Sequence, residues 1–442
     1  RKLDYSIQIS KLFYERFIKD EEITLFSPHD VPGLYEAFGM PEFDELYEKY
    51  ERSYKTPKTK IRAQELIGAL LKERAETGRI YIMNIDHCNT HSSFKDKVYM
   101  SNLCQEITLP TTPVQHIDDE NGEIALCILS AVNLGLIRDK DDLEELCDLS
   151  VRALDEIIDY QEYPIVAAKQ SAQSRRSLGI GYIGLAHYLA KNHVAYGDKE
   201  ALELVDETTE AFQYYLLKAS NNLAQEKGKC EYFEKTKYSD GILPIDTYKK
   251  DLDKIVKRKL SYDWKELRKD IQEHGLRHST LSAQMPSESS SVVSNATNGI
   301  EPPRDYLSVK KSKKGTLKQI VPDYYRLKNF YTLLWDMPSN EGYINVVATM
   351  QKYFDQAISG NWSYNPENYT DGEVPISVMA NDLLTTYKLG WKTSYYQNTY
   401  DAKTDIDEPA HSVGWHDNQP MKEREEFQSQ EDYDDYCEAC MI

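Results

Sequence analysis

The sequence predicts an α/β fold, because segments with helical spacing of apolar residues alternate with short apolar runs typical of strands. The chain has 442 residues, more than a single hydrophobic core usually serves. We therefore expect one large α/β unit followed by a smaller C-terminal lobe.

The first strong element is a helix over residues 61–77, whose apolar residues recur at helical spacing. Gly78 follows it at the position of a C-cap glycine. Residues 80–85, rich in Ile and Tyr, then read as a strand. The polar residues 86–91, Asp-His-Cys-Asn-Thr-His, are expected to form a turn after it.

Two more helices are predicted further along the chain, over residues 141–160 and 199–227, and Gly228 ends the second. After about residue 400 the periodicity stops. Residues 401–436 carry twelve Asp or Glu against three Lys or Arg, together with two prolines and a glycine. Such a segment cannot bury a core, so we expect residues 401–442 to form a flexible acidic tail.

Composition excludes several classes of protein. The formal charge is −20 and no Lys/Arg-rich block occurs, so nucleic acid is not an expected ligand. No apolar run approaches the roughly 18 residues of a membrane span, and no leader pattern opens the chain. Seven cysteines, an odd number in a large acidic chain, argue against a disulfide framework. We expect a cytoplasmic protein with reduced thiols and no membrane contact.

The most informative motif is Tyr-Met-Ser-Asn-Leu-Cys-Gln-Glu-Ile at 99–107. In an extended segment, Asn102, Cys104 and Glu106 would share one face because alternate side chains point the same way. A hydrolase would need a histidine base beside the thiol, and the motif has none. In isolation the pattern would indicate a strand end with a buried cysteine.

Other segments occur with this motif: GRIYIMNIDHCNTH, DENGEIALC, GILPIDTYKKDLD and SNATNGIEPP. Together they resemble the large subunit of aerobic, class I ribonucleotide reductase, over nearly the whole chain. That family's large subunit is much longer than 442 residues, so we expect this chain to be a C-terminal portion of it. A split gene is one origin that would yield such a chain.

The resemblance implies a catalytic domain built as a ten-stranded α/β barrel of two five-stranded halves, with the reactive cysteine on a central finger loop. Residues 1–285 would form the second part of this barrel, with the finger loop near 102–106. Residues 286–400 would supply the last barrel strands and a small C-terminal α/β lobe that carries a phosphate loop and a tyrosine pair. Residues 401–442 would be the tail with redox cysteines.

The resemblance also implies roles for the motif residues. Cys104 would hold a thiyl radical that abstracts a ribose hydrogen, Glu106 would be the base on the 3′-hydroxyl, and Asn102 would hydrogen-bond the sugar hydroxyls. Cys127 would be one of two cysteines that end each turnover as a disulfide, its partner lying in the absent first half.

Cys88, in the 86–91 segment, lacks the second ligand cluster that zinc needs, so no metal site is expected.

Pro286, Ser287, Glu288, Ser289 and Ser290 have a composition suited to a helix N-terminus whose N–H groups bind phosphate. A serine run is more commonly a linker. The resemblance makes it the diphosphate site of the substrate, with neutral donors that suit an acidic protein.

Tyr395 and Tyr396 resemble the tandem tyrosines that relay the radical from a second protein, with Tyr395 adjacent to Cys104. Neighbours in a regular strand face opposite sides, so a stacked pair requires a local irregularity. Cys437 and Cys440, in a C-x-x-C spacing, resemble the shuttle that reduces the buried disulfide. A terminal zinc clip is the alternative for these two.

We therefore expect thiyl-radical reduction of ribonucleoside diphosphates. The partners would be the N-terminal half of the large subunit, a metal-containing small subunit that supplies the radical, and thioredoxin or glutaredoxin as reductant; this chain itself would bind no cofactor. Two rivals remain: a non-catalytic fragment that binds the small subunit, and a cysteine acyl-transfer enzyme, which predicts a histidine beside Cys104.

Overall fold

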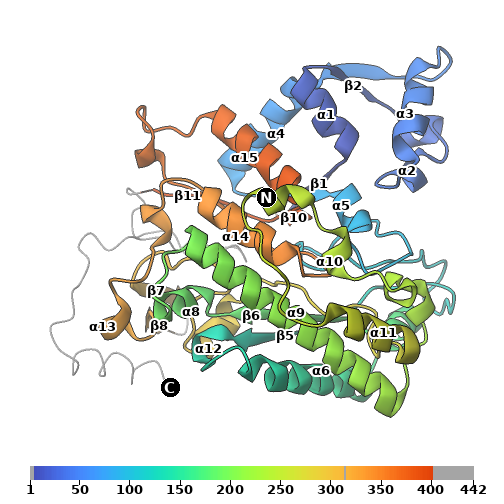
Figure 1. The fold of residues 1–442 in the computed structure, drawn as a ribbon. Helices are drawn as coiled ribbons and strands as arrows, with labels where there is room; N and C mark the ends of the chain where they lie inside the picture. Colours follow the sequence, from blue (N-terminus) through green and yellow to red (C-terminus); the bar gives the residue numbers. More distant parts are fainter. Residues whose placement is uncertain (1–3, 313–314, 402–442) are drawn as a thin grey trace.

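The computed structural model describes residues 4–312 and 315–401, and its helices and strands are drawn in Figure 1. The helices are α1 (Lys11–Lys19), α2 (Leu34–Ala37), α3 (Phe43–Arg52), α4 (Ala63–Thr77), α5 (Ile85–Thr90), α6 (Asp142–Tyr160), α7 (Val166–Arg175), α8 (Leu185–Lys191), α9 (Lys199–Lys227), α10 (Pro244–Thr247), α11 (Trp264–His274), α12 (Glu288–Val293), α13 (Tyr324–Leu327), α14 (Glu341–Gln351) and α15 (Ile376–Leu389). The strands are β1 (Ser6–Ile9), β2 (Glu22–Leu25), β3 (Thr59–Arg62), β4 (Tyr81–Asn84), β5 (Ile128–Asn133), β6 (Leu178–Ile183), β7 (Leu307–Ser312), β8 (Gly315–Ile320), β9 (Trp362–Tyr364), β10 (Thr393–Ser394) and β11 (Gln397–Thr399).

The mixed α/β class and the strongest predicted elements are confirmed. The helix predicted over 61–77 is α4, and Gly78 ends it with a positive φ of 67°, which glycine adopts without the steric cost of a Cβ. The helices predicted over 141–160 and 199–227 are α6 and α9. Helix α4 begins at residue 63 because Thr59–Arg62 pair with β2 as strand β3.

Two local predictions are wrong. Residues 86–91 are not a turn, since most of them form helix α5, whose His87 and Cys88 are buried. Residues 99–107 are not extended, and the loop closes on itself through hydrogen bonds from Gln105 N to the Asn102 carbonyl and from Asn102 N to the Ile107 carbonyl. Gln105 has a φ of +72°, so the segment is a tight turn.

The strands that surround this loop form a continuous arc linked by backbone hydrogen bonds. Strand β5 pairs in parallel with β6, β6 bonds to residues 280–283, and Gln284 bridges to Ile358. Residue 360 then bonds to the segment after β10, β10 pairs with β4, and β4 pairs in parallel with β1. Within the residues described, the arc is open, with β5 and β1 at its two ends, and no closed barrel is formed.

One hydrophobic core joins the early and late parts of the chain, since it includes both Ile9 and Trp391. Helix α9 lies along the middle of this core and packs against α6, α11 and α14 (Figure 1). A smaller cluster, with Leu12, Phe43 and Tyr47, holds α1, α2 and α3 together at the upper right of Figure 1. The division at residue 285 stays a prediction.

The helices described include none that is both long and apolar enough to cross a membrane.

Candidate active site around the Cys104 loop

The loop that carries Cys104 is held from one side by residues 356–359. Gln356 Oε1 accepts a hydrogen bond from Thr108 N at 3.2 Å, and Ala357 N donates to the Glu106 carbonyl at 3.0 Å. Ser359 Oγ donates to the carbonyl of Cys104 and, at 3.2 Å, to Glu106 Oε2. Three of these four contacts come from the side chains of Gln356 and Ser359, so the loop's position depends on the identity of residues 356 and 359.

The three motif residues lie close together although the segment is a turn. Glu106 is 3% exposed and interacts with Asn102 and Ser359, and Asn102 Oδ1 also accepts from Ile107 N at 3.0 Å. Burial raises the pKa of Glu106, which suits a group that must take up a proton near neutral pH. The tight turn, and not a strand, brings these side chains together.

Cys104 is partly exposed and its sulfur receives a hydrogen bond from the Tyr395 hydroxyl at 3.4 Å. Burial raises the pKa of the Cys104 thiol, with the charge of Glu106 adding to the effect, so the sulfur keeps its hydrogen at neutral pH. A protonated S–H suits hydrogen-atom transfer, whereas a nucleophilic cysteine needs a lowered pKa. Of the residues described, no histidine is hydrogen-bonded to this sulfur.

Tyr395 and Tyr396 lie between β10 and β11, where the strand is interrupted. Their ring centroids are 4.1 Å apart with planes at 52°, so both rings lie on one side of the chain. The backbone irregularity expected for a paired arrangement is present, although the two rings are tilted and not stacked. Tyr81 on β4, which is 1% exposed, packs against both rings at centroid distances of 4.7 and 5.4 Å.

Cys127 comes directly before β5 and is partly exposed. Gln356 Nε2 donates to its sulfur at 3.5 Å, so the same amide touches the Cys104 loop and the Cys127 thiol. Burial raises the pKa of Cys127 to about 12. A Cβ at position 179 would lie 2.9 Å from this sulfur, which explains the glycine on neighbouring β6.

Three other cysteines, Cys88, Cys147 and Cys230, are at most 2% exposed, and no disulfide links the five cysteines described. The predicted shuttle residues Cys437 and Cys440 lie outside the described residues.

The serine run forms a helix start, as predicted, with Ser287 as the N-cap of α12. Ser287 Oγ donates to the Met285 carbonyl at 3.0 Å, whereas Pro286, Ser289 and Ser290 are exposed. Glu288 and Arg304 line a hollow beside this helix start. Burial lowers the pKa of Arg304, and Glu301 and Glu288 act against that effect.

No group of His, Cys, Asp or Glu side chains in the described part of the chain is arranged to hold a metal ion. The histidines in and directly after α5 bind the backbone: His87 Nδ1 donates to the Trp391 carbonyl, and His91 Nε2 donates to the Gln351 carbonyl.

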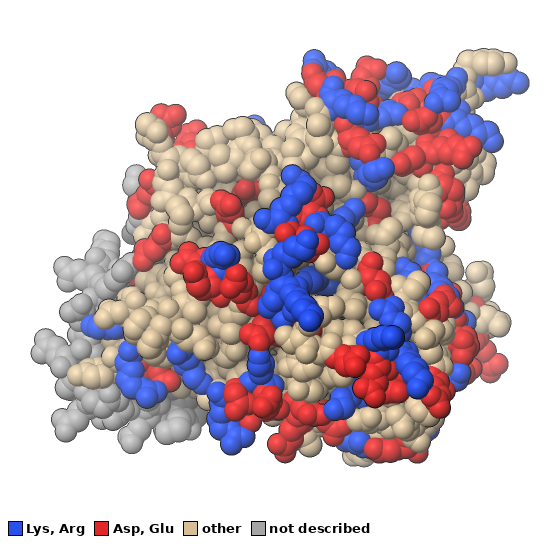
Figure 2. All heavy atoms as spheres, viewed as in Figure 1, with Lys and Arg blue, Asp and Glu red and all other residues tan. Residues whose placement is uncertain are grey.

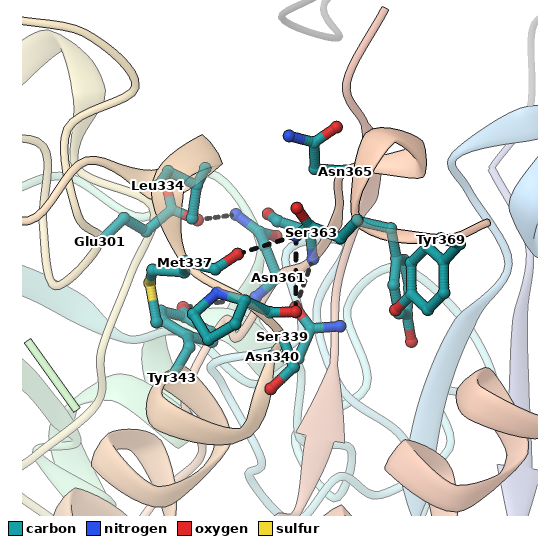
Figure 3. A pocket seen from close by; sticks show the side chains of 13 residues that line it. Glu301, Leu334, Met337, Ser339, Asn340, Tyr343, Asn361, Ser363, Asn365 and Tyr369 are labelled. Carbon is teal, nitrogen blue, oxygen red and sulfur yellow. Dashed lines mark hydrogen bonds between the residues drawn. The ribbon is translucent and has the colours of Figure 1, made fainter. Parts of the chain in front are cut away.

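Sequence reasoning missed Gln356, Ser359, Asn361 and Arg74. Asn361 Oδ1 accepts from Tyr396 N at 3.0 Å, and its amide nitrogen donates to Glu301 at 2.6 Å across the small pocket in Figure 3. The first three occur in the segment QAISGN at 356–361, where polar residues mixed with small ones are the one signal that the sequence offered.

The model of the ribonucleotide reductase barrel domain matches residues 1–397. The chain is 61% identical over 413 residues to the ribonucleoside-diphosphate reductase subunit alpha of Haemophilus influenzae, with 92% of this chain and 55% of the relative covered. It is 57% identical over 410 residues to the ribonucleoside-diphosphate reductase 1 subunit alpha of Escherichia coli, with 92% of this chain and 54% of the relative covered. It is 44% identical over 411 residues to the ribonucleoside-diphosphate reductase subunit alpha of phage T4, with 91% and 54% covered.

The chain thus spans about half the length of these curated relatives. Because the family model covers most of the chain and the identities are high, the chain belongs to the ribonucleotide reductase barrel-domain family.

Proposed function

We propose that this chain is the C-terminal catalytic portion of a class I ribonucleoside-diphosphate reductase large subunit and reduces ribonucleoside diphosphates by thiyl-radical chemistry. The observation that carries the proposal is the contact of the Tyr395 hydroxyl with the Cys104 sulfur, 3.4 Å away, with the tilted ring of Tyr396 packed against Tyr395. A buried carboxyl, Glu106, lies beside them.

In this proposal a radical reaches Cys104 through Tyr396 and Tyr395. The Cys104 thiyl takes the 3′ hydrogen of the ribose and returns it at the end of the turnover. Glu106 accepts the proton of the 3′-hydroxyl, and its raised pKa supports that role. Asn102 binds the hydroxyls. The 2′-hydroxyl takes up a proton and leaves as water. Cys127 and a second thiol together give up two electrons and two protons as they join in a disulfide.

The substrate diphosphate would bind at Pro286–Ser290 and the start of α12. The exposed hydroxyl of Ser289 supports this assignment, and so does the neighbouring Arg304. The Ser290 hydroxyl donates to the Ser287 carbonyl at 3.0 Å, so it would have to rotate away from that carbonyl to reach a phosphate. Neutral donors and one guanidinium would then hold the anion on a protein with a formal charge of −20, whose acidic and basic side chains are interspersed over the face seen in Figure 2.

The reaction would also need partners. The N-terminal half of the large subunit would supply the second redox cysteine, and a metal-containing small subunit would supply the radical. Cys437 and Cys440 would pass reducing equivalents from thioredoxin or glutaredoxin to Cys127. The open arc supports the need for the first partner: the outer edge of β5 has no strand beside it in the described residues, and Leu129 on β5 is 42% exposed. Parallel strands are normally buried on both faces.

Acyl transfer is disfavoured, because it needs a histidine base at Cys104 and the hydrogen-bonding neighbour of that sulfur is Tyr395.

The test is reduction of CDP in the presence of a small subunit, thioredoxin and dithiothreitol, comparing this chain alone with this chain plus the N-terminal half. Activity in the mixture that Cys104→Ala removes and Cys88→Ala leaves intact would support the proposal. Sustained activity of the chain alone would mean that another cysteine replaces the missing partner. If neither the chain alone nor the mixture reduces CDP although each half is folded, the result would favour a fragment that binds the small subunit without catalysis.

A further inference from the structure

Arg74, near the end of α4, is completely buried, and its guanidinium binds three backbone carbonyls. One terminal nitrogen donates to the carbonyls of Ile80 and Tyr395, at 2.5 and 2.8 Å, and the other donates to the carbonyl of Tyr396 at 3.1 Å. The guanidinium also stacks 4.8 Å from the ring of Trp362. A side chain from the first quarter of the chain thus holds the backbone of both tyrosines.

The geometry of these bonds is informative because consecutive carbonyls of a regular strand point to opposite sides. Arg74 receives the carbonyls of residues 395 and 396 in one guanidinium fork, which requires that the strand be broken there. The same break places the Tyr395 and Tyr396 rings side by side, 4.1 Å apart, where a regular strand would direct them to opposite faces. The hydrogen bonds of Arg74 and the contact between the two tyrosine rings are therefore two consequences of one backbone conformation.

Arg74 is also unusual in its charge. Among the hydrogen bonds of the described residues, Arg74 donates to backbone carbonyls and to no carboxylate. Burial lowers its pKa to about 10, which still leaves it charged at neutral pH. Burying a cation without an anionic partner costs desolvation free energy, so an apolar residue at this position would give a more stable fold.

We propose that Arg74 is a positioning residue for the tyrosine pair: its planar fork fixes the carbonyls of residues 395 and 396, so that the Tyr395 hydroxyl faces Cys104 while the Tyr396 ring packs against the Tyr395 ring. Arg74 touches neither substrate nor the reacting atoms and acts through the backbone of the pair. Its importance for catalysis rests on the proposed function, but its effect on the pair's geometry does not.

The test uses the full 442-residue chain with 3-fluorotyrosine placed at position 395 or 396, in wild type, Arg74→Met and Arg74→Lys. Lys keeps the charge but is a point donor that cannot reproduce the fork. Lys72→Met, on the exposed side of the same helix, is the matched control, since the Lys72 side chain is 69% exposed. The first readout is the ¹⁹F shift and the phenol pKa at each position, which needs no enzyme activity.

We expect both Arg74 variants to move the ¹⁹F shifts at 395 and 396 toward that of free fluorotyrosine and to lower the phenol pKa at 395, whereas Lys72→Met leaves them unchanged. In the assembled enzyme, kcat for CDP should fall on the order of 100-fold, as misplaced reacting groups do, with KM unchanged because the serine run is intact. A folded Arg74→Met or Arg74→Lys with wild-type shifts would overturn the inference, and Arg74→Lys serves if Arg74→Met does not fold. If the Arg74 variants alter the ¹⁹F shifts but the assembled wild-type enzyme never reduces CDP, the positioning role stands and the proposed function is refuted.

Discussion

The hydroxyl of Tyr395 donates a hydrogen bond to the sulfur of Cys104, although 291 residues separate them in the chain. The contact forms because the loop at 102–107 is clamped by residues 356–359, and because Tyr395 N donates to the carbonyl of Gly360 at 2.8 Å. One short segment therefore positions both the cysteine and the tyrosine, and this is the relationship on which the proposed chemistry depends.

Tyr395→Phe is expected to abolish CDP reduction while leaving the fold intact. The substitution removes the hydroxyl that reaches Cys104 and keeps the ring that packs on Tyr81 and Tyr396. Loss of one hydrogen bond should lower the free energy of unfolding by about 1 kcal/mol. CDP assays with thermal unfolding of the same samples check both parts. Tyr54→Phe, at a position 90% exposed, is the control, and activity of Tyr395→Phe within a few-fold of wild type would exclude the relay.

The pH dependence of kcat should report Glu106. A base must be ionised to accept a proton, and burial raises the pKa of Glu106, so the acidic limb of the profile is expected at a pH above the ordinary value of 4.5 for glutamate. Glu106→Gln should remove the activity, whereas Glu120→Gln, at an exposed position, should leave the profile unchanged. An acidic limb at or below 4.5 in the wild type would contradict this role.

The same raised pKa makes a prediction for stability. A carboxyl whose pKa is higher in the folded state contributes stability below its unfolded pKa and loses it as pH rises through the folded value. Ionised Glu106 therefore costs stability at pH 7, and Glu106→Gln should unfold at an equal or higher denaturant concentration there. Inactivity without destabilisation would separate a catalytic residue from a structural one.

Gln356→Leu is expected to disturb the Cys104 loop and the Cys127 thiol together. The side-chain amide of Gln356 accepts a hydrogen bond from Thr108 N and donates to the Cys127 sulfur and the Leu178 carbonyl. A leucine at this position would leave these three groups buried and unpaired. The free energy of unfolding should fall by about 1–3 kcal/mol. The rate of iodoacetamide labelling at Cys127, followed by mass spectrometry, should change, with Cys230 as the internal reference. Gln115→Leu, at an exposed position, is the control, and unchanged labelling with unchanged stability would refute the coupling.

The sequence predicted the α/β class and the long helices well, because α4, α6 and α9 carry strong local signals that tertiary packing reinforces. It failed at residues 99–107, where alternation suggested a strand. The turn there depends on clamps from residues 356–359, which lie more than two hundred positions away and leave no local trace. The same reason explains why Arg74 was missed: it is one arginine on an amphipathic helix, and its three acceptors become visible only when the chain is folded. Local patterns point to the candidate site residues, and long-range contacts reveal what positions them.

The outer edge of β5 is expected to bind the N-terminal half of the large subunit. Leu129 on β5 is 42% exposed, and that strand pairs with β6 alone in the part of the chain described. Leu129→Asp should leave the stability of this chain almost unchanged, because surface substitutions usually alter it by less than about 0.5 kcal/mol. It should weaken association with the N-terminal half, because a buried carboxylate without a partner is costly to desolvate. Sedimentation of the two halves, mixed in equal amounts, measures the association. Leu149→Asp, at a position 55% exposed on α6, is the control and should assemble normally. Equal association of both variants would place the docking surface elsewhere, and a loss of stability in Leu129→Asp alone would mean that the β5 edge is already covered in the free chain.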